Sequence, residues 1–315
     1  MKKLLDRLVR PSTRAFFRQA RRTENYSWFD TLHGYVYGRW PYLYIGIGTG
    51  EHPAAKLLSA LAGVAALLRP ITGWLVNSRP GKPGIGFADT YHGKVVTLPA
   101  ATQLVQINEP VRLPNLEKII PYARARDLIL ENPEHIIALD CPCRSSREHP
   151  CLPLDVCLIV GEPFASFISE HQPEHTRWIS QKQAEEILKA EHARGHVHHA
   201  FFKDAMFGRF YAICNCCSCC CGAMQAQRHG TPMLASSGYL AQVEETLCIG
   251  CEQCAASCPF DALGLDGYVM SADRARCMGC GVCVDVCEQG AISLERAPEK
   301  GEPLEIFRLL DSPVI

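Results

Sequence analysis

Cysteine is absent from the first 140 residues, and all 18 cysteines of this 315-residue chain fall within two stretches, 141–157 and 214–287. Secreted disulfide frameworks staple short chains that lack a core, and a chain of this length can bury one without them. The start, MKKLLDRLVR, lacks the apolar run and the small-residue cleavage site of a signal peptide. We therefore expect a reducing, cytoplasmic setting in which the thiols are metal ligands.

An excess of one charge sign and long apolar runs are also missing. The formal net charge is -1, so the chain as a whole is not built to bind nucleic-acid phosphates. The uncharged segment Leu57–Leu68 has twelve residues, whereas a membrane-spanning helix takes about 20. We expect a buried helix there, with an interfacial segment as the alternative. GIGTGE ends in Glu51 where a dinucleotide fingerprint needs glycine, so a turn is expected.

The first 22 residues are strongly basic. They hold eight basic residues against the single acid Asp6, with leucine and phenylalanine interleaved. Such a basic, partly amphipathic arm is expected to be a helical extension that packs on its own domain. Contact with an anionic membrane surface or an acidic partner is the alternative. The basic residues are Lys2, Lys3, Arg7, Arg10, Arg14, Arg18, Arg21 and Arg22.

Two short apolar runs end directly in cysteines. The run at 135–140 indicates a strand that leads into Cys141, and residues 207–213 indicate an extended segment that leads into Cys214. Two strands that each end in thiols predict one shared site.

Helical spacing marks two other segments. Apolar residues in 181–194 predict a helix closed by Gly195, and those in 116–130 predict another that Pro121 kinks or restarts.

The end of the chain repeats a cysteine spacing. The pattern C-x2-C-x2-C-x3-C occurs twice, and each cysteine of the second copy lies 29 residues after its counterpart. Zinc modules instead use two spaced CxxC pairs, so a pair of zinc sites fits poorly. The duplication resembles the bacterial ferredoxin domain with two [4Fe-4S] clusters, over about residues 239–297.

The resemblance implies a crossed set of ligands. In such domains three closely spaced cysteines bind one cluster and the fourth binds the other. The first cluster would be held by Cys248, Cys251, Cys254 and Cys287. The second would be held by Cys277, Cys280, Cys283 and Cys258. Because metal then ties the two halves together, we expect this small domain not to fold without iron.

Residues beside these cysteines bear on the cluster environment. The family keeps small or apolar residues there, which shield the sulfurs and leave backbone amides free to hydrogen-bond to them. The residues at these positions are Ile249, Gly250, Met278 and Gly279. Glu288 stands where the first half has Pro259, and its carboxylate should lower the potential of a nearby cluster.

Ten cysteines remain upstream, without the ferredoxin spacing. They are Cys141, Cys143, Cys151, Cys157, Cys214, Cys216, Cys217, Cys219, Cys220 and Cys221. The CPCR and CNCCxCCC strings resemble those of anaerobe proteins that carry a cysteine-rich module ahead of a dicluster ferredoxin. Soft thiolates select iron–sulfur clusters, zinc or copper(I). We expect at least one additional iron–sulfur cluster, with a structural zinc site or free thiols as the alternative.

The arginine and the histidines near these thiols each have two possible interpretations. Arg144 could offset the charge of a reduced cluster or form a surface ion pair with Asp140 or Glu148. The histidines at 171, 175, 192, 196, 198 and 199 could be metal ligands or proton relays, although ordinary packing is the favoured expectation. The absence of CxxCH and of C-x3-C-x2-C leaves covalent haem and radical chemistry without a basis in the sequence.

These patterns predict an α+β fold with a C-terminal pseudo-twofold ferredoxin domain behind a mixed helix and strand module. The expected parts are an N-terminal region at 1–90, a cysteine-rich module at 91–238, the ferredoxin domain at 239–297 and a tail at 298–315. The expected function is iron–sulfur electron transfer in anaerobic metabolism, with redox proteins as partners. The alternative is a reductase with its active site at the upstream cysteines, fed by the ferredoxin domain. A third option is a subunit of a larger redox complex.

Overall fold

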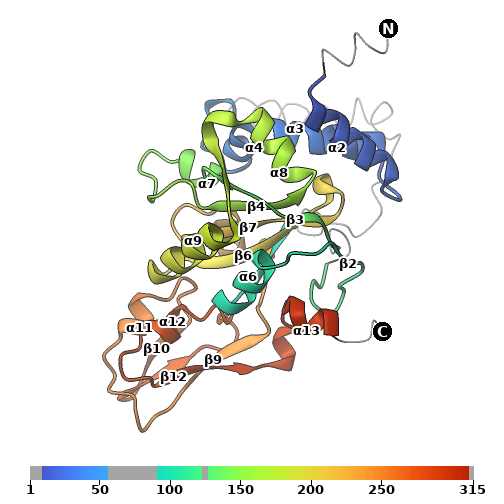
Figure 1. The fold of residues 1–315 in the computed structure, drawn as a ribbon. Coiled ribbons are helices and arrows are strands. Elements are labelled where there is room, and N and C mark those ends of the chain that lie inside the picture. The colour runs from blue at the N-terminus through green and yellow to red at the C-terminus, as the bar shows by residue number, and fades with distance from the viewer. Residues whose placement is uncertain (1–8, 56–90, 123–126, 312–315) are drawn as a thin grey trace, which may run out of the picture.

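The computed structural model describes residues 9–55, 91–122 and 127–311, so the segment Leu57–Leu68 lies outside it. Figure 1 shows the arrangement, with N-terminal helices at one end, a large sheet in the middle and the cysteine repeat at the other end. The α+β fold class is confirmed. Within the described ranges, no helix combines the length and the apolar character needed to cross a membrane.

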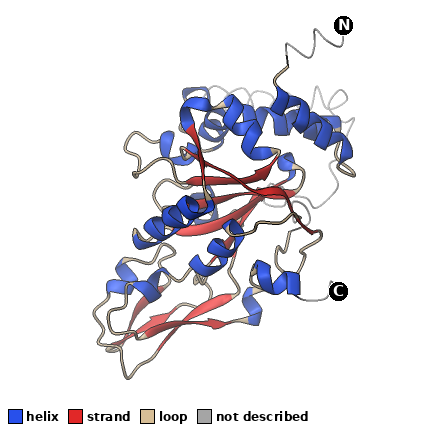
Figure 2. Cartoon of the chain, in the orientation of Figure 1, coloured by secondary structure: helices blue, strands red, loops and turns tan. Residues whose placement is uncertain are grey.

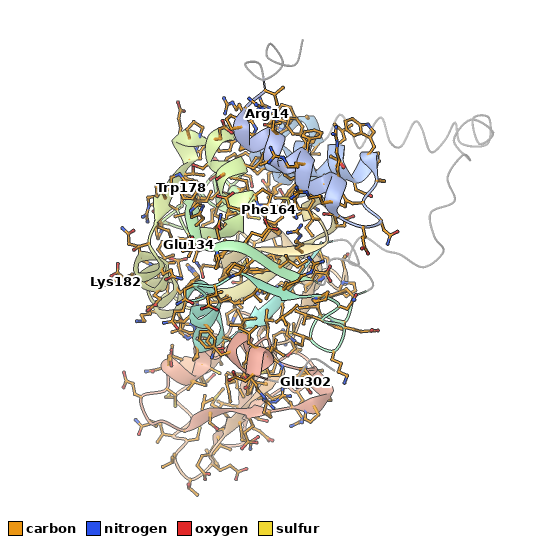
Figure 3. All side chains as sticks on the ribbon, turned by 45° about the vertical axis from the view of Figure 1, so that its right-hand side comes forward. Arg14, Glu134, Phe164, Trp178, Lys182 and Glu302 are labelled. Carbon is orange, nitrogen blue, oxygen red and sulfur yellow. The ribbon has the colours of Figure 1, made fainter. Side chains whose placement is uncertain are left out.

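Four helices cover one face of the sheet. They are α2 (Pro11–Arg22), α3 (Trp28–Arg39), α4 (Pro41–Gly48) and α8 (Phe164–His171). Helix α3 begins with a capping box in which Ser27 and Asp30 satisfy each other's backbone amides. Phe16 of α2 stacks on Phe167 of α8, with ring centroids 4.7 Å apart. With side chains drawn, Phe164 lies between these helices and the sheet (Figure 3). Residues 1–8 of the basic arm, with Lys2, Lys3 and Arg7, lie outside the described ranges. The described part is helical from Pro11 and buries Phe16 and Ala20.

The central sheet is mixed and has the strand order β2-β3-β4-β7-β6-β1-β8, with β5 also paired to β3. All pairs are antiparallel except β1 with β8. The strands are β1 (Tyr91–Val96), β2 (Val111–Leu113), β3 (Leu128–Leu139), β4 (Cys157–Glu162), β5 (Thr176–Ile179), β6 (Val197–Lys203), β7 (Arg209–Cys216) and β8 (Leu234–Ala235). Both predicted thiol-terminated strands are present, as β3 and β7, and β4 lies between them.

Alternation along the strands decides which face the cysteines occupy. In β4, Cys157 and Ile159 point into the core under the N-terminal helices, whereas Leu158 and Val160 point into the opposite core. The opposite face is covered by α6 (Leu98–Val105), α9 (Gln181–Ala193) and α13 (Ile306–Asp311), as Figure 2 shows. The upstream cysteines therefore gather beneath α3 and α4.

The cysteine repeat forms a third, smaller core. Its elements are β9 (Tyr239–Val243), α11 (Gln253–Ala256), β10 (Leu263–Asp266), β11 (Val269–Ala272), α12 (Val282–Asp285) and β12 (Ile292–Arg296). Strand β9 pairs with β12, and β10 pairs with β11. Short helices complete the chain at α7 (Pro142–Ser145), η2 (Pro173–His175), η3 (Asp204–Met206), α10 (Gly222–Arg228) and η4 (Pro298–Lys300).

Two expected elements differ. The turn expected at GIGTGE begins only at Thr49, because α4 continues through Gly48. The helix predicted over 181–194 is α9, but the described parts of the other predicted helix, residues 116–122 and 127–130, are not helical. Asn115 has a φ of 57°, which turns the chain at the start of that segment, and β3 begins at Leu128. The apolar spacing there arises because Ile119 and Ile120 fill the core from a loop.

Candidate metal centres

The eight repeat cysteines line two separate cavities of about 20 Å³ each. Cys287 lies near Cys254, and Cys258 lies near Cys280 and Cys283, so each half contributes one thiol to the other half's cavity. The first cavity is lined by Cys248, Cys251, Cys254 and Cys287. The second is lined by Cys258, Cys277, Cys280 and Cys283. This grouping is the one that the family resemblance implies for two cubanes.

Backbone amides donate to the sulfurs in a pattern that follows the repeat. Met270 N donates to Cys248 Sγ at 3.3 Å, and its counterpart Ala241 N donates to Cys277 Sγ at 3.5 Å. Ala262 N and Ala291 N donate to Cys258 and Cys287, both at 3.3 Å. Amide donors of this kind stabilise negative charge on the sulfurs.

The two cavities differ in exposure. Cys251 is exposed to solvent, whereas its counterpart Cys280 is only 9% exposed. Ile249 is 66% exposed and Met278 is 9% exposed, so the expected shielding of the sulfurs is present at Met278 and reduced at Ile249. Met278, Cys280 and Val282 join the core beneath the N-terminal helices, which places the second cavity against the rest of the protein.

The upstream cysteines divide into a compact four-thiol set and a wider six-thiol set. In the four-thiol set all sulfurs lie within 4.8 Å of one another. Cys151 Sγ is 3.1 Å from Cys219 Sγ, which is 3.6 Å from Cys220 Sγ. The members of this set are Cys151, Cys217, Cys219 and Cys220.

The six-thiol set lines a cavity of about 60 Å³ at the ends of β3, β4 and β7. Its thiols contact one another in a chain: Cys143 and Cys157 lower the pKa of Cys141, and Cys141 and Cys214 raise the pKa of Cys157. Contact with Cys221 raises the pKa of Cys216. The members are Cys141, Cys143, Cys157, Cys214, Cys216 and Cys221, and Cys217 of the four-thiol set also lines this cavity. The expected shared site of the two thiol-terminated strands corresponds to this cavity.

Helix α3 also contributes to the six-thiol cavity. Tyr37 and Tyr211 line it, and their hydroxyls are hydrogen-bonded at 2.6 Å. Burial raises the pKa of Tyr37, which keeps the phenol neutral. Sequence reasoning missed this pair; the aromatic-rich stretch around Tyr37 was the available signal, but it does not say which ring reaches the thiols.

Arg144 is buried and 1% exposed, which excludes the expected surface ion pair with Asp140 or Glu148. Its Nη2 instead donates to Glu191 Oε2 at 2.6 Å and to the carbonyl oxygen of Asn215 at 3.0 Å. Its Nε has no hydrogen-bond partner among the described residues. Arg144 therefore lines the six-thiol cavity as one member of a buried ion pair with Glu191.

The histidines pack as hydrogen-bonding groups. Within the described residues, none belongs to a compact group of metal-ligand atoms. His198 Nδ1 lies 2.6 Å from Asn215 Oδ1, and His198 Nε2 lies 3.2 Å from His192 Nδ1. His192 Nε2 lies 2.8 Å from Asp285 Oδ2 of α12. Burial lowers the pKa of His198 to about 4 and also lowers that of His192.

These contacts form one connected row. It runs from Asn215, between two thiols of the six-thiol set, to Asp285 in the cysteine repeat. Sequence reasoning singled out His192 and His198 but not their polar partners, because partners this far apart in the chain leave no local pattern.

The buried His199 packs beside Phe201, with ring centroids 5.8 Å apart, and neither of its ring nitrogens has a hydrogen-bond partner among the described residues. The other three singled-out histidines have polar partners. His171 Nε2 lies 2.8 Å from Thr13 Oγ1, His175 Nδ1 lies 3.1 Å from Asp140 Oδ2, and His196 Nδ1 lies 2.7 Å from Glu191 Oε2.

Comparison with known proteins agrees with the repeat. A family model described as a 4Fe-4S dicluster domain matches residues 240–288. A search of the curated proteins finds no match. Residues 240–288 thus match a 4Fe-4S dicluster domain, and a separate group of cysteines between residues 141 and 221 could hold a metal ion.

Proposed function

We propose that this chain is an iron–sulfur electron-transfer protein that passes electrons from its dicluster domain to a further cluster in the six-thiol cavity. The observation that carries the proposal is the pair of four-thiol cavities with exchanged ligands. The first cluster would be held by Cys248, Cys251, Cys254 and Cys287. The second would be held by Cys277, Cys280, Cys283 and Cys258. A [4Fe-4S] cluster supplies one-electron chemistry when bound.

The chain's own residues fit this role. Amides donate to Cys248, Cys258, Cys277 and Cys287, which favours the extra negative charge of a reduced site. The two halves also differ in charge. Glu288 is exposed in the second half, whereas the uncharged Pro259 stands at the equivalent position of the first half. Burial of Cys280 and Cys283 excludes water from the second cavity.

The solvent exposure of the two dicluster cavities favours one of them as the site that exchanges electrons with a partner protein. Cys251 opens the first cavity to solvent, among the exposed apolar residues Leu247, Ile249 and Tyr268, and this face would meet a redox partner. The second cavity instead packs against the core beneath the N-terminal helices. Arg228 of α10 donates to the carbonyl oxygen of Pro259 at 3.1 Å, next to Cys258.

The six-thiol cavity supports a further cluster. Its donors are the six soft thiols together with Cys217, and its walls are mostly apolar. Arg144, which is paired with Glu191, lies near Cys141. The upstream strings also resemble those of anaerobe iron–sulfur proteins.

The test is electron paramagnetic resonance on anaerobically prepared protein, together with iron and sulfide analysis. Reduction should give low-potential [4Fe-4S] signals, and their absence would refute the proposal. About eight irons per chain would mean two cubanes only, whereas about twelve or more would mean that the upstream thiols bind iron as well.

A reductase is the second candidate, favoured by the Tyr37–Tyr211 pair at the six-thiol cavity. The cavity is roughly three times as large as either dicluster cavity and carries hydroxyl groups that an electron relay does not need. Tyr37→Phe should slow reoxidation of the reduced protein by its acceptor while sparing the dicluster signals. Unchanged reoxidation with every acceptor tried would argue against an active site here.

We also propose that the N-terminal helices contact an anionic membrane surface. Trp28, Leu32 and Val36 are exposed at four-residue spacing along α3, and the exposed Trp40 follows directly after that helix. Arginines on the adjacent α2 are exposed at 18, 21 and 22. Trp28→Ser/Trp40→Ser should reduce co-sedimentation with vesicles of anionic lipid but not alter the iron content.

A further inference from the structure

We infer that Cys151, Cys217, Cys219 and Cys220 bind a single tetrahedral metal ion, zinc or iron, and not a cluster. The inference deepens the proposed function and rests on it in one respect: the dicluster cavities, taken to hold cubanes, serve as the reference for cluster spacing.

The spacing of the sulfurs carries the argument. Four thiolates at about 2.3 Å from one zinc ion lie ~3.8 Å from one another, by tetrahedral geometry. Thiolates on the four irons of a cubane lie roughly 6 Å apart, because each binds a different iron. In the four-thiol set every pair of sulfurs lies within 4.8 Å. Among the described residues, no three cysteines of the dicluster domain are that close together, and neither are any three of the six-thiol set.

The turn that carries three of these thiols is held in place by side chains. Gln225 Nε2 donates to the carbonyl oxygen of Cys219 at 2.7 Å, and Arg147 Nη2 donates to that of Cys220 at 3.3 Å. Arg147 also donates to Gln225 Oε1 at 2.8 Å. These contacts fix the backbone of the turn before any ion binds, which lowers the entropic cost of binding.

Charge near the site suits a thiolate-rich ion. Four thiolates around a divalent ion carry a net charge of about -2. Arg144 lies close enough to Cys217 for the two charges to affect each other, and Arg147 contacts the Cys220 backbone. Arg144 also pairs with Glu191, and Arg147 also pairs with Glu51, so the two cations offset only part of that charge.

The position of the site gives the ion a structural role. Cys151 lies in the loop between Cys143 and Cys157, and the three other ligands lie between Cys216 and Cys221. An ion at this point would join the two segments that supply the six-thiol cavity. The four thiols leave no ligand position open, as in structural tetrathiolate sites.

The experiment compares metal and acid-labile sulfide in the full-length wild type and in Cys151→Ser/Cys219→Ser. We expect the variant to lose about one zinc or one iron per chain and no sulfide. Loss of one iron would remove the high-spin ferric signal of a tetrathiolate site, whereas loss of one zinc would leave the resonance spectrum unchanged. Cys254→Ser, in a dicluster cavity, is the matched control and should lose several irons together with sulfide.

Loss of several irons with an equal amount of sulfide from the double variant would overturn the inference, as would no loss of metal at all. If the double variant does not fold, the single variant Cys219→Ser, at the exposed position, replaces it. If the ion is zinc, zinc-edge X-ray absorption of the wild type should give four sulfur neighbours at about 2.3 Å. A wild type with neither zinc nor a high-spin ferric tetrathiolate signal would also overturn it. Failure of the proposed function is separate, because it would appear as missing low-potential cubane signals in the wild type.

Discussion

The two halves of the dicluster domain carry the same ligand spacing in opposite surroundings. Cys251 and Ile249 of the first half face solvent, whereas their counterparts Cys280 and Met278 are buried against the rest of the protein. The repeat therefore determines where the ligands lie, and the packing of the domain determines which cavity meets solvent. Ligand spacing can predict two clusters, but not which of them would exchange electrons with a partner.

Hydrogen bonds show the same difference. Ser237 Oγ donates to the carbonyl oxygen of Gly279 at 2.7 Å, and Ser237 N donates to that of Met278 at 3.1 Å. Asp285 of the second half contacts His192, while alanine occupies the equivalent position 256 of the first half. The second half has thus acquired docking contacts that its counterpart does not share at these positions.

The largest expected effect is that of Gly279→Ala. Gly279 has a φ of 64°, and a Cβ there would overlap the Tyr239 carbonyl oxygen and Ser237 Oγ. Backbone strain and overlap should together lower the free energy of unfolding by roughly 4 kcal/mol. Gly250→Ala, the counterpart, should cost about half as much, because Tyr268 lies in an exposed turn that can shift. Urea unfolding of both variants measures the difference, and equal losses would contradict it.

The next largest effect is a pH dependence of stability that comes from the buried Lys94, which lies near Arg296 of the dicluster domain. Burial, followed by the nearby Arg296, lowers the pKa of Lys94 to about 7. Between pH 7 and the unfolded-state pKa of 10.5, the unfolded chain binds more protons, so this group makes the protein more stable as the pH rises. Lys94→Met should remove roughly 3 kcal/mol of that rise between pH 7 and pH 9.5.

The measurement for Lys94 is the urea midpoint of wild type and variant across this pH range, with Lys182→Met at the start of α9 as the exposed control. If the difference in urea midpoint between wild type and Lys94→Met does not change with pH, the lowered pKa of Lys94 is contradicted.

A matched pair of apolar residues tests the burial difference itself. Met278→Ala should lower the free energy of unfolding by about 2 kcal/mol, since it removes a buried side chain. Ile249→Ala, at the equivalent exposed position, should cost under ~0.5 kcal/mol. Thermal unfolding of the two variants is the readout. Similar shifts in both would mean that the second half is not docked as described.

The smallest expected effect concerns the contact between Asp285 and His192. Asp285 is largely exposed, so Asp285→Ala should cost about 1 kcal/mol or less. It should also speed proteolysis of residues 236–238, which join β8 of the sheet to β9 of the dicluster domain. The exposed Glu288 supplies the control variant Glu288→Ala, and an equal rate in both variants would remove the docking role of Asp285.

The sequence predicted what local spacing encodes. The 29-residue repeat, the strands that lead into Cys141 and Cys214, and helix α9 all follow from neighbours along the chain. The division of the upstream thiols into four and six could not be predicted, because Cys151 meets Cys219 across 68 residues. The choice between the two interpretations of Arg144 could not be made from the sequence, because nothing beside it in the chain reveals Glu191 as its partner.

The exposed hairpin of the first half has a practical consequence. Tyr268, at the turn between β10 and β11, is 94% exposed, and its backbone lies beside Gly250 in the loop that carries Cys251. A chemical tether attached at residue 268 would orient each molecule on an electrode with this loop toward the conducting surface. Voltammetry could then address the outer cavity first, without a natural donor protein.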